Sequence, residues 1–268
     1  IQNNRYPSYK WIKHSVGNKQ SLINDQVNSI IEDSEGDLWY GTNNGISLQD
    51  SKTGKWRSFL STFENVQNSK NHIFTTLCEV SPGIIWAGGY FSGLYQIDKR
   101  TSKTTYFTPA SYAHESIRPD KYIRDIRKDS RGYVWSGGYY NLKRINVQTK
   151  DIRLYHGLHS VTAIIEKDDK SMWIGTATGL FLLDIESGKY ERIQLPVEST
   201  YVYSLYQTKQ GSLYIGTSGS GVLIYDPQTK LFTHYYTGNC AMISNNIYTI
   251  LSDEDNEILL STENGLTS

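Results

Sequence analysis

Residues 27–46 read VNSIIEDSEGDLWYGTNNGI, and this stretch decides the fold because its pattern returns along the chain. The related segments are 73–88, 123–137, 161–176, 202–217 and 247–262. A large apolar residue marks the same place in each unit, in the order Trp39, Trp86, Trp135, Trp173, Tyr214 and Leu259. The spacing of about 40 to 50 positions is typical of propeller blades and of some helical arrays.

The residue pattern within a unit separates these two architectures. Apolar and polar residues alternate in short runs rich in Ile, Val, Tyr, Thr and Trp, and Gly, Asn, Asp and Ser bound these runs. A helical array would need two stripes of apolar residues at helical spacing in every unit, and no such stripe with caps is present. The sequence therefore predicts an all-β propeller of four-stranded blades.

The first unit illustrates the predicted blade. Its strands are expected at residues 27–32, 38–42, 46–49 and 56–60. Turns with Asp33 and Gly36 suit the first connection, because Asp caps its own turn backbone and Gly supplies a positive φ. Trp39 and its equivalents are expected to pack between neighbouring blades, since a residue of this kind recurs from unit to unit.

The repeat also predicts how the chain is divided. Residues 1–268 are expected to form one β-propeller that is the N-terminal part of a larger protein. Five complete blades are predicted at about 24–60, 71–108, 121–156, 159–195 and 200–236, followed by a partial sixth at 245–268. Residues 9–14 are expected to be an orphan outer strand that closes the ring. Either a six-bladed ring closes with a thin last blade, or the chain is the front part of a larger protein whose intact ring has six or seven blades. Since an unclosed ring leaves strand edges unpaired, truncation is favoured.

Composition excludes several classes of protein. The 27 Lys and Arg residues balance 27 Asp and Glu, which argues against a nucleic-acid binder. The 21 Tyr, 7 Phe and 6 Trp residues are too many for a disordered chain. No stretch approaches the roughly 20 apolar residues of a membrane helix, and residues 1–5 lack the features of a signal peptide. The chain is therefore expected to be cytosolic, or to begin after a removed signal.

The unit at 27–46 resembles the two-component regulator propeller repeat, and residues 161–180 and 202–222 are similar to it. The resemblance implies the periplasmic sensor region of a hybrid two-component system (a histidine kinase fused to a response regulator) of polysaccharide-degrading gut bacteria. In that family a second propeller, an immunoglobulin-like module, a membrane helix, a kinase, a receiver and a DNA-binding domain follow. An oligosaccharide ligand and a phosphorelay that regulates polysaccharide-utilisation genes are then expected.

The resemblance also implies a localisation, an activity and partners for the chain. The implied localisation is periplasmic, with the full-length protein anchored in the inner membrane. Kinase activity is expected only in the full-length protein, so the chain should be a non-catalytic sensor that binds no nucleic acid and uses no cofactor. Its expected partners are the second propeller and the immunoglobulin-like module of the same full-length chain, and a homodimer is left open.

Variable loops indicate where a ligand would bind. In a propeller the second–third and the fourth–first strand connections share one side, and here they are long at 62–71, 109–121 and 237–245. Aromatic pairs beside cationic groups would suit a sugar, with rings for stacking and polar groups for hydroxyls or a carboxylate. The predicted ligand-binding residues are Tyr90, Phe91, Tyr139, Tyr140, Arg118, Arg124, His72 and His114.

Two other functions remain open. A lyase resembling streptogramin lyase shares the Asp-x-x-Gly-x-x-Trp pattern, but its chemistry needs a general base and a metal near the central channel. Only His72 and His159 are placed at strand starts, without a recurring acidic partner. No catalytic residue and no metal ligand is therefore predicted; Asp253, Asp255 and Glu257 lack the Gly and distal Glu of a calcium loop. A protein-interaction scaffold is the third alternative.

Overall fold

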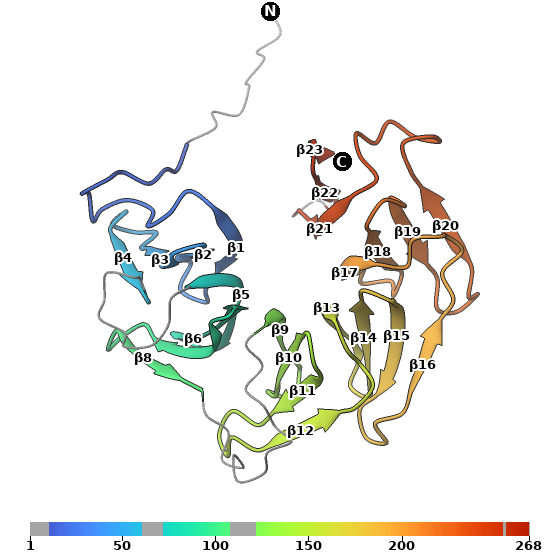
Figure 1. Ribbon diagram of the computed structural model, residues 1–268, viewed down its shortest axis with the longest axis horizontal. Coiled ribbons are helices and arrows are strands. Elements are labelled where there is room, and N and C mark those ends of the chain that lie inside the picture. Colours follow the sequence, from blue (N-terminus) through green and yellow to red (C-terminus); the bar gives the residue numbers. More distant parts are fainter. Residues whose placement is uncertain (1–10, 61–71, 108–121, 254–255, 268) are drawn as a thin grey trace, which may run out of the picture.

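A computed structural model describes residues 11–60, 72–107, 122–253 and 256–267 of the chain. Every secondary-structure element in these ranges is a β-strand, and the strands form six antiparallel sheets. The sheets follow one another around a ring in chain order, with the first strand of each sheet nearest the centre (Figure 1). The prediction of an all-β propeller with a partial sixth blade is confirmed.

The strands run outward from the centre within each blade. The first blade has β1 (Val27–Glu32), β2 (Leu38–Thr42), β3 (Gly45–Gln49) and β4 (Trp56–Phe59). The second has β5 (Ile73–Ser81), β6 (Ile84–Tyr90), β7 (Gly93–Asp98) and β8 (Lys103–Tyr106). The third has β9 (Ile123–Lys128), β10 (Val134–Gly138), β11 (Leu142–Ile145) and β12 (Ile152–Tyr155).

The remaining blades repeat this order. The fourth has β13 (Val161–Asp168), β14 (Ser171–Thr176), β15 (Gly179–Asp184) and β16 (Tyr190–Ile193). The fifth has β17 (Val202–Gln207), β18 (Leu213–Thr217), β19 (Val222–Tyr225) and β20 (Phe232–Tyr235). The sixth has three described strands, β21 (Ile247–Ser252), β22 (Ile258–Thr262) and β23 (Gly265–Thr267).

Side-chain hydrogen bonds explain why the first turn of a blade forms where it does. Asp33 Oδ1 accepts from the backbone N–H groups of Glu35 and Asp37, both at 3.0 Å, and Gly36 has a φ of 86°. Asp33 Oδ2 accepts from Trp39 Nε1 at 2.8 Å. The turn therefore positions the large residue that follows it. The third blade repeats the arrangement, with Trp135 Nε1 donating to Asp129 Oδ2 at 2.9 Å.

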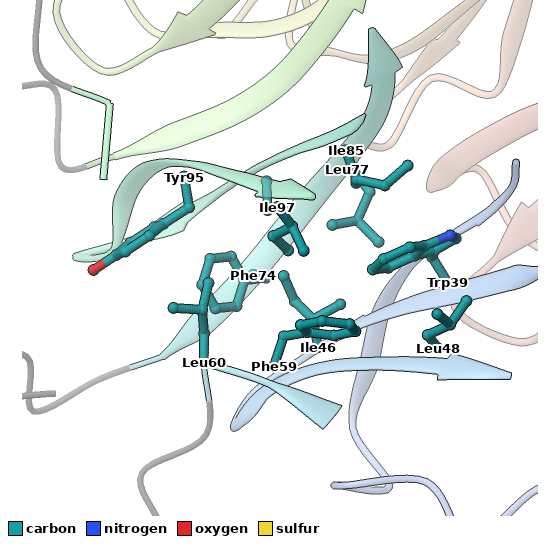
Figure 2. Close-up of a cluster of buried hydrophobic side chains, with 11 residues drawn as sticks. Trp39, Ile46, Leu48, Phe59, Leu60, Phe74, Leu77, Ile85, Tyr95 and Ile97 are labelled. Atoms are coloured by element: carbon teal, nitrogen blue, oxygen red, sulfur yellow. The ribbon is translucent and has the colours of Figure 1, made fainter. Parts of the chain in front are cut away.

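The core lies between blades rather than within one of them. Figure 2 shows Trp39 and its neighbours from the first blade against Phe74, Leu77 and Ile85 of the second. Trp39, Trp86, Trp135 and Trp173 are all fully buried, and each belongs to a cluster that includes residues of the next blade. This confirms the predicted packing, and it fixes the blades relative to one another.

Contacts between blades also follow chain order. The inner strands pack as β1 with β5, β5 with β9, β9 with β13, β13 with β17, and β17 with β21. In the described part of the chain, β21 and β1 make no comparable contact. Within the same ranges no helix is long and apolar enough to cross a membrane.

The predicted closing strand at 9–14 lies only partly within the structure. Residues 9 and 10 are outside the described residues, and His14 forms one isolated parallel bridge, to Leu22. The described part of the last sheet consists of β21, β22 and β23. The pairing of residues 9–14 with the last blade therefore stays a prediction.

Candidate functional site

The antiparallel order of the sheets divides the connections between two faces of the ring. Connections between first and second strands, and between third and fourth strands, lie on one face, which we call the turn face. Connections between second and third strands, and from one blade to the next, lie on the opposite face, which we call the loop face. The six predicted ligand-binding residues that the structure describes belong to the loop face: His72, Tyr90, Phe91, Arg124, Tyr139 and Tyr140.

A β-bulge occupies the same place in all six inner strands, close to the loop face. The pairing register of each inner strand shifts there, as between Val27 and Ser29. Such a bulge adds one residue and re-aims its side chain, and bulges are common beside functional sites. The residues inserted in this way are Asn28, Thr75, Arg124, Thr162, Tyr203 and Tyr248.

Three of the bulge residues tie neighbouring inner strands together. Asn28 Nδ2 donates to the backbone oxygen of Phe74 at 3.1 Å, and Thr75 Oγ1 donates to that of Ile123 at 2.8 Å. Thr162 makes the equivalent bond to Val202. Because these short side chains are committed to the backbone, they leave the three long bulge residues, Arg124, Tyr203 and Tyr248, as the ones available for recognition.

Arg124 brings together residues of three blades. Its Nη1 donates to the Tyr201 hydroxyl at 2.5 Å, and its guanidinium lies 5.6 Å from the centroid of the Tyr90 ring. Tyr90 ends β6 of the second blade, whereas Tyr201 precedes β17 of the fifth. Among the described residues no carboxylate forms an ion pair with Arg124. The guanidinium is thus held in place by neutral groups.

Aromatic rings extend from Arg124 in two directions. Tyr201 contacts Tyr203 at 4.7 Å between ring centroids, and Tyr203 contacts Tyr248 at 5.3 Å. On the other side, Tyr122 contacts Tyr90 at 6.0 Å, Phe91 at 4.7 Å and Tyr139 at 6.1 Å, and Tyr139 contacts Tyr140. We call the whole set the Arg124 cluster: Tyr90, Phe91, Tyr122, Arg124, Tyr139, Tyr140, Tyr201, Tyr203 and Tyr248.

The cluster presents both stacking surfaces and hydroxyl groups to solvent. Phe91, Tyr139, Tyr140 and Tyr248 are exposed. Burial raises the pKa of the Tyr201 phenol above its ordinary value, although the neighbouring Arg124 acts in the opposite direction. The phenol therefore keeps its proton at neutral pH. Since its oxygen accepts the bond from Arg124, its own O–H can donate to a ligand.

Five of the eight predicted site residues come together in this cluster: Tyr90, Phe91, Arg124, Tyr139 and Tyr140. His72 does not, because it is only 2% exposed and its backbone oxygen accepts from Gly45 N at 2.8 Å. Arg118 and His114 lie outside the described residues. His159, considered for a lyase, contacts the backbone oxygen of Tyr140 and so supports that loop.

Sequence reasoning missed Tyr122, Tyr201, Tyr203 and Tyr248. Each lies beside or within the start of an inner strand, next to the bulge. A tyrosine at the second position of a repeat unit, as in Tyr203 and Tyr248, was the available signal. The described residues contain no group of three or more His, Cys, Asp or Glu side chains that could hold a metal ion.

Comparison with known proteins identifies the repeat. The family model of the two-component regulator propeller matches residues 21–44 and 196–219, which confirms the predicted type of repeat. Histidine kinase P4 of Formosa agariphila is 25% identical over 262 residues, which cover 90% of this chain and 18% of that protein. The chain therefore spans about a fifth of the length of this curated relative.

Solved structures share the fold at low sequence identity. The extracellular domain of a hybrid two-component system of B. thetaiotaomicron matches with a TM-score of 0.77 and 19% identity, over 96% of this chain and 35% of that one. Virginiamycin B lyase of Staphylococcus aureus matches with a TM-score of 0.71 and 16% identity, over 90% of this chain and 78% of that one. The propeller fold is thus shared with the extracellular domain of a two-component system and with a lyase.

Proposed function

We propose that this chain, a β-propeller with two-component regulator propeller repeats, is the extracytoplasmic ligand-sensing domain of a hybrid two-component protein and that it detects a glycan fragment. The observation that carries the proposal is the Arg124 cluster, in which a guanidinium without a carboxylate partner among the described residues lies among tyrosine rings. The regulator-type repeats and the likeness to a histidine kinase support the signalling class.

The cluster has the chemistry that a sugar needs. Tyrosine rings can stack on the apolar C–H face of a sugar ring, and phenol hydroxyls can exchange hydrogen bonds with its hydroxyl groups. The fork of N–H donors on Arg124 suits a carboxylate or a pair of hydroxyls. Rings and hydroxyls from several blades converge there, so one ligand would contact elements far apart in the sequence.

Signalling follows from this arrangement as a shift of conformational populations. The Arg124 cluster spans the second, third, fifth and sixth blades, so a ligand that prefers one arrangement of these blades stabilises that arrangement. In the proposed full-length protein, a second propeller, an immunoglobulin-like module and an inner-membrane anchor carry this change to the kinase. A phosphorelay then regulates genes for polysaccharide utilisation.

The proposed role is non-catalytic. The side chains that contact one another in the cluster are tyrosines, a phenylalanine and an arginine. None of these has the ordinary pKa of a general base near neutral pH. A lyase remains the enzymatic alternative because the propeller of virginiamycin B lyase is similar. Incubation with a streptogramin B depsipeptide, followed by mass spectrometry, tests it: opening of the ring would replace the sensor proposal.

Calorimetry tests the sensor proposal directly. The chain and the intact sensor region are titrated with a panel of oligosaccharides released from bacterial and algal polysaccharides. We expect binding that Arg124→Gln and Tyr203→Ala each weaken at least tenfold, which corresponds to about 1.4 kcal/mol. Tyr190→Ala is the matched control, because this exposed tyrosine starts β16 near the turn face.

The outcomes separate the alternatives. Binding by both proteins, with loss in the two cluster variants, supports a glycan site on this propeller. Binding by the intact region alone contradicts the site proposed for this chain. If neither protein binds any oligosaccharide, glycan sensing is wrong and a scaffold role becomes the better account.

A further inference from the structure

A hollow on the loop face lies outside the Arg124 cluster. It has a volume of about 550 Å³ and is formed by three segments of the fourth and fifth blades and the connection to the sixth. These segments are the loop after β16, the loop between β18 and β19, and the end of β20 with the loop that follows. β16 and β20 are the outer strands of neighbouring blades (Figure 1).

Hydrogen bonds fix two of the three segments that form this hollow. The backbone oxygen of Asn245 accepts from Gly219 N at 3.1 Å and from Gly221 N at 2.9 Å, which joins two of the three segments. Asn239 braces the segment after β20 from within, because its side chain donates to His234 O at 2.8 Å and accepts from Tyr236 N at 2.9 Å. These two segments are therefore pre-organised, which reduces the entropy cost of binding.

The polar groups of the hollow are mainly acceptors. His234 Nε2 lies 2.6 Å from the backbone oxygen of Ser220. Since a carbonyl oxygen can only accept, Nε2 carries the hydrogen, and Nδ1 of the neutral ring is an acceptor. The Glu198 carboxylate, also in the lining, accepts as well. Asn245 Oδ1 already accepts from Thr237 N at 2.8 Å, so its amide N–H groups are the donors it offers.

An aromatic and aliphatic wall completes the hollow. The Tyr236 ring stacks on His234 with centroids 4.8 Å apart and an interplanar angle of 30°. Leu195 and Pro196 add apolar surface, and no Lys or Arg is among the lining residues. A flat apolar wall, a carboxylate and several acceptors together suit a ring that carries many hydroxyl donors. The volume is within the range of ligand pockets, about 300–1,000 Å³.

We propose that this hollow is a second subsite that binds one uncharged sugar ring of the glycan, with Tyr236 against its C–H face and Glu198 and His234 accepting from its hydroxyls. This assignment rests on the proposed function. Glu198 disfavours a carboxylate or sulfate here, whereas Arg124 favours one in its own cluster. Residues 195–203 connect the two sites, since Leu195 and Glu198 line the hollow and Tyr201 and Tyr203 belong to the cluster.

Saturation-transfer NMR and calorimetry with small probes test the subsite on the full chain. The probes are the methyl glycosides of glucose, galactose, mannose and xylose, with methyl glucuronoside and glucosamine for comparison. We expect at least one neutral glycoside to bind, and Glu198→Gln and Tyr236→Ala each to weaken it at least tenfold. Glu186→Gln is the control, because Glu186 is exposed in a turn on the opposite face.

The results distinguish this inference from the proposed function. Arg124→Gln should leave the neutral glycoside unaffected while it weakens longer oligosaccharides. Equal binding to wild type, Glu198→Gln and Tyr236→Ala overturns the subsite, as does stronger binding of methyl glucuronoside or glucosamine. If no glycoside binds but oligosaccharides still bind in an Arg124-dependent way, the subsite is wrong and glycan sensing stands. Thermal melts of each variant confirm that it is folded.

Discussion

Lys99 and Arg124 lie on opposite faces of the same ring, and their surroundings differ in kind. Lys99 on the turn face is buried, and its Nζ contacts Asp33, Glu35 and Asp37 at 2.7, 2.6 and 2.7 Å. Arg124 on the loop face is exposed and meets a phenol and an aromatic ring. The comparison teaches that the Lys99 charge on the turn face joins two blades, whereas the Arg124 charge on the loop face has no carboxylate partner among the described residues.

Repetition separates the two faces in the same way. On the turn face, Glu79 accepts from the backbone N and the hydroxyl of Ser34 in the preceding blade, at 2.7 and 3.0 Å. Glu166 does the same for Ser130, at 2.8 and 2.6 Å. On the loop face, the six bulge positions hold side chains of four different types. The Glu–Ser hydrogen bonds that join blades recur on the turn face, whereas the bulge side chains on the loop face, where we propose that a ligand binds, differ from blade to blade.

Of the changes considered, acid should lower the free energy of unfolding the most, because it removes many turn-face interactions at once. Burial opposes ionisation of Asp33 and Asp37, but hydrogen bonds from Lys99 and other donors outweigh it and hold their pKa values below the ordinary value. Hydrogen bonds within turns likewise lower the pKa values of Asp50, Asp98, Asp184 and Asp226.

The sign of the acid effect follows from these shifts. A lowered folded-state pKa stabilises the protein fully above the unfolded value of about 4, and this stability is lost as pH falls through the folded value. Urea unfolding between pH 7 and pH 2.5 should give a constant free energy down to about pH 5 and then a steady fall. A free energy of unfolding that is flat below pH 4 would contradict the role of these carboxylates.

Among single substitutions, we expect Lys99→Met to lower the free energy of unfolding the most. In this variant the Asp33 and Asp37 carboxylates would stay buried without the ammonium group that neutralises them. Removing one partner of a buried ion pair lowers the free energy of unfolding by about 3–5 kcal/mol. Urea unfolding at pH 7 measures the loss, with Lys103→Met as a control because Lys103 is exposed at the start of β8 in the same blade. The acid-induced fall should also be smaller in Lys99→Met, because the hydrogen bonds from Lys99 that lower the pKa values of Asp33 and Asp37 are gone. Equal losses in the two variants would show that the Lys99 contacts do not hold the blades.

Arg124→Gln should have the smallest effect on stability. The side chain is exposed and makes one hydrogen bond to Tyr201, and surface substitutions of this kind change the free energy of unfolding by about 0.5 kcal/mol or less. Thermal unfolding should therefore give a Tm within about 2 °C of wild type. A loss of stability as large as that of Lys99→Met would mean that Arg124 stabilises the packing of the blades. The turn face and the loop face would then not differ in the role of their charged residues.

The features that could be predicted best from the sequence are those that recur from one repeat unit to the next. Asp33, Gly36 and Trp39 recur with the same spacing as Asp129, Gly132 and Trp135, so the turn, the strand that follows and the packing between blades could all be inferred from local chemistry. Lys99 could not be paired with Asp33 in advance, because the pairing depends on how one blade sits beside the next. Tyr203 and Tyr248 were missed for a related reason: both stand at the second position of their repeat units, but the bulge that re-aims this position is a property of strand register.

The predicted site illustrates the same division. Tyr90, Phe91, Tyr139 and Tyr140 were found because adjacent aromatic residues in a loop are visible in the sequence. His72 was included for its place at a strand start, and its burial shows that proximity to the loop face does not fix the direction of a side chain. The contact between Arg124 and Tyr201 joins the third and fifth blades, so only the arrangement of the blades around the ring reveals it.

The strand order within each sheet has a consequence for how the chain acquires its structure. All strand pairs within the described sheets join strands that are consecutive in the sequence. Folds dominated by such local pairing fold faster than sheets that wait for distant strands. During synthesis, where N-terminal parts fold first, we expect each blade to complete its ladder as soon as its last strand emerges. The ring then grows by docking one finished blade onto the next.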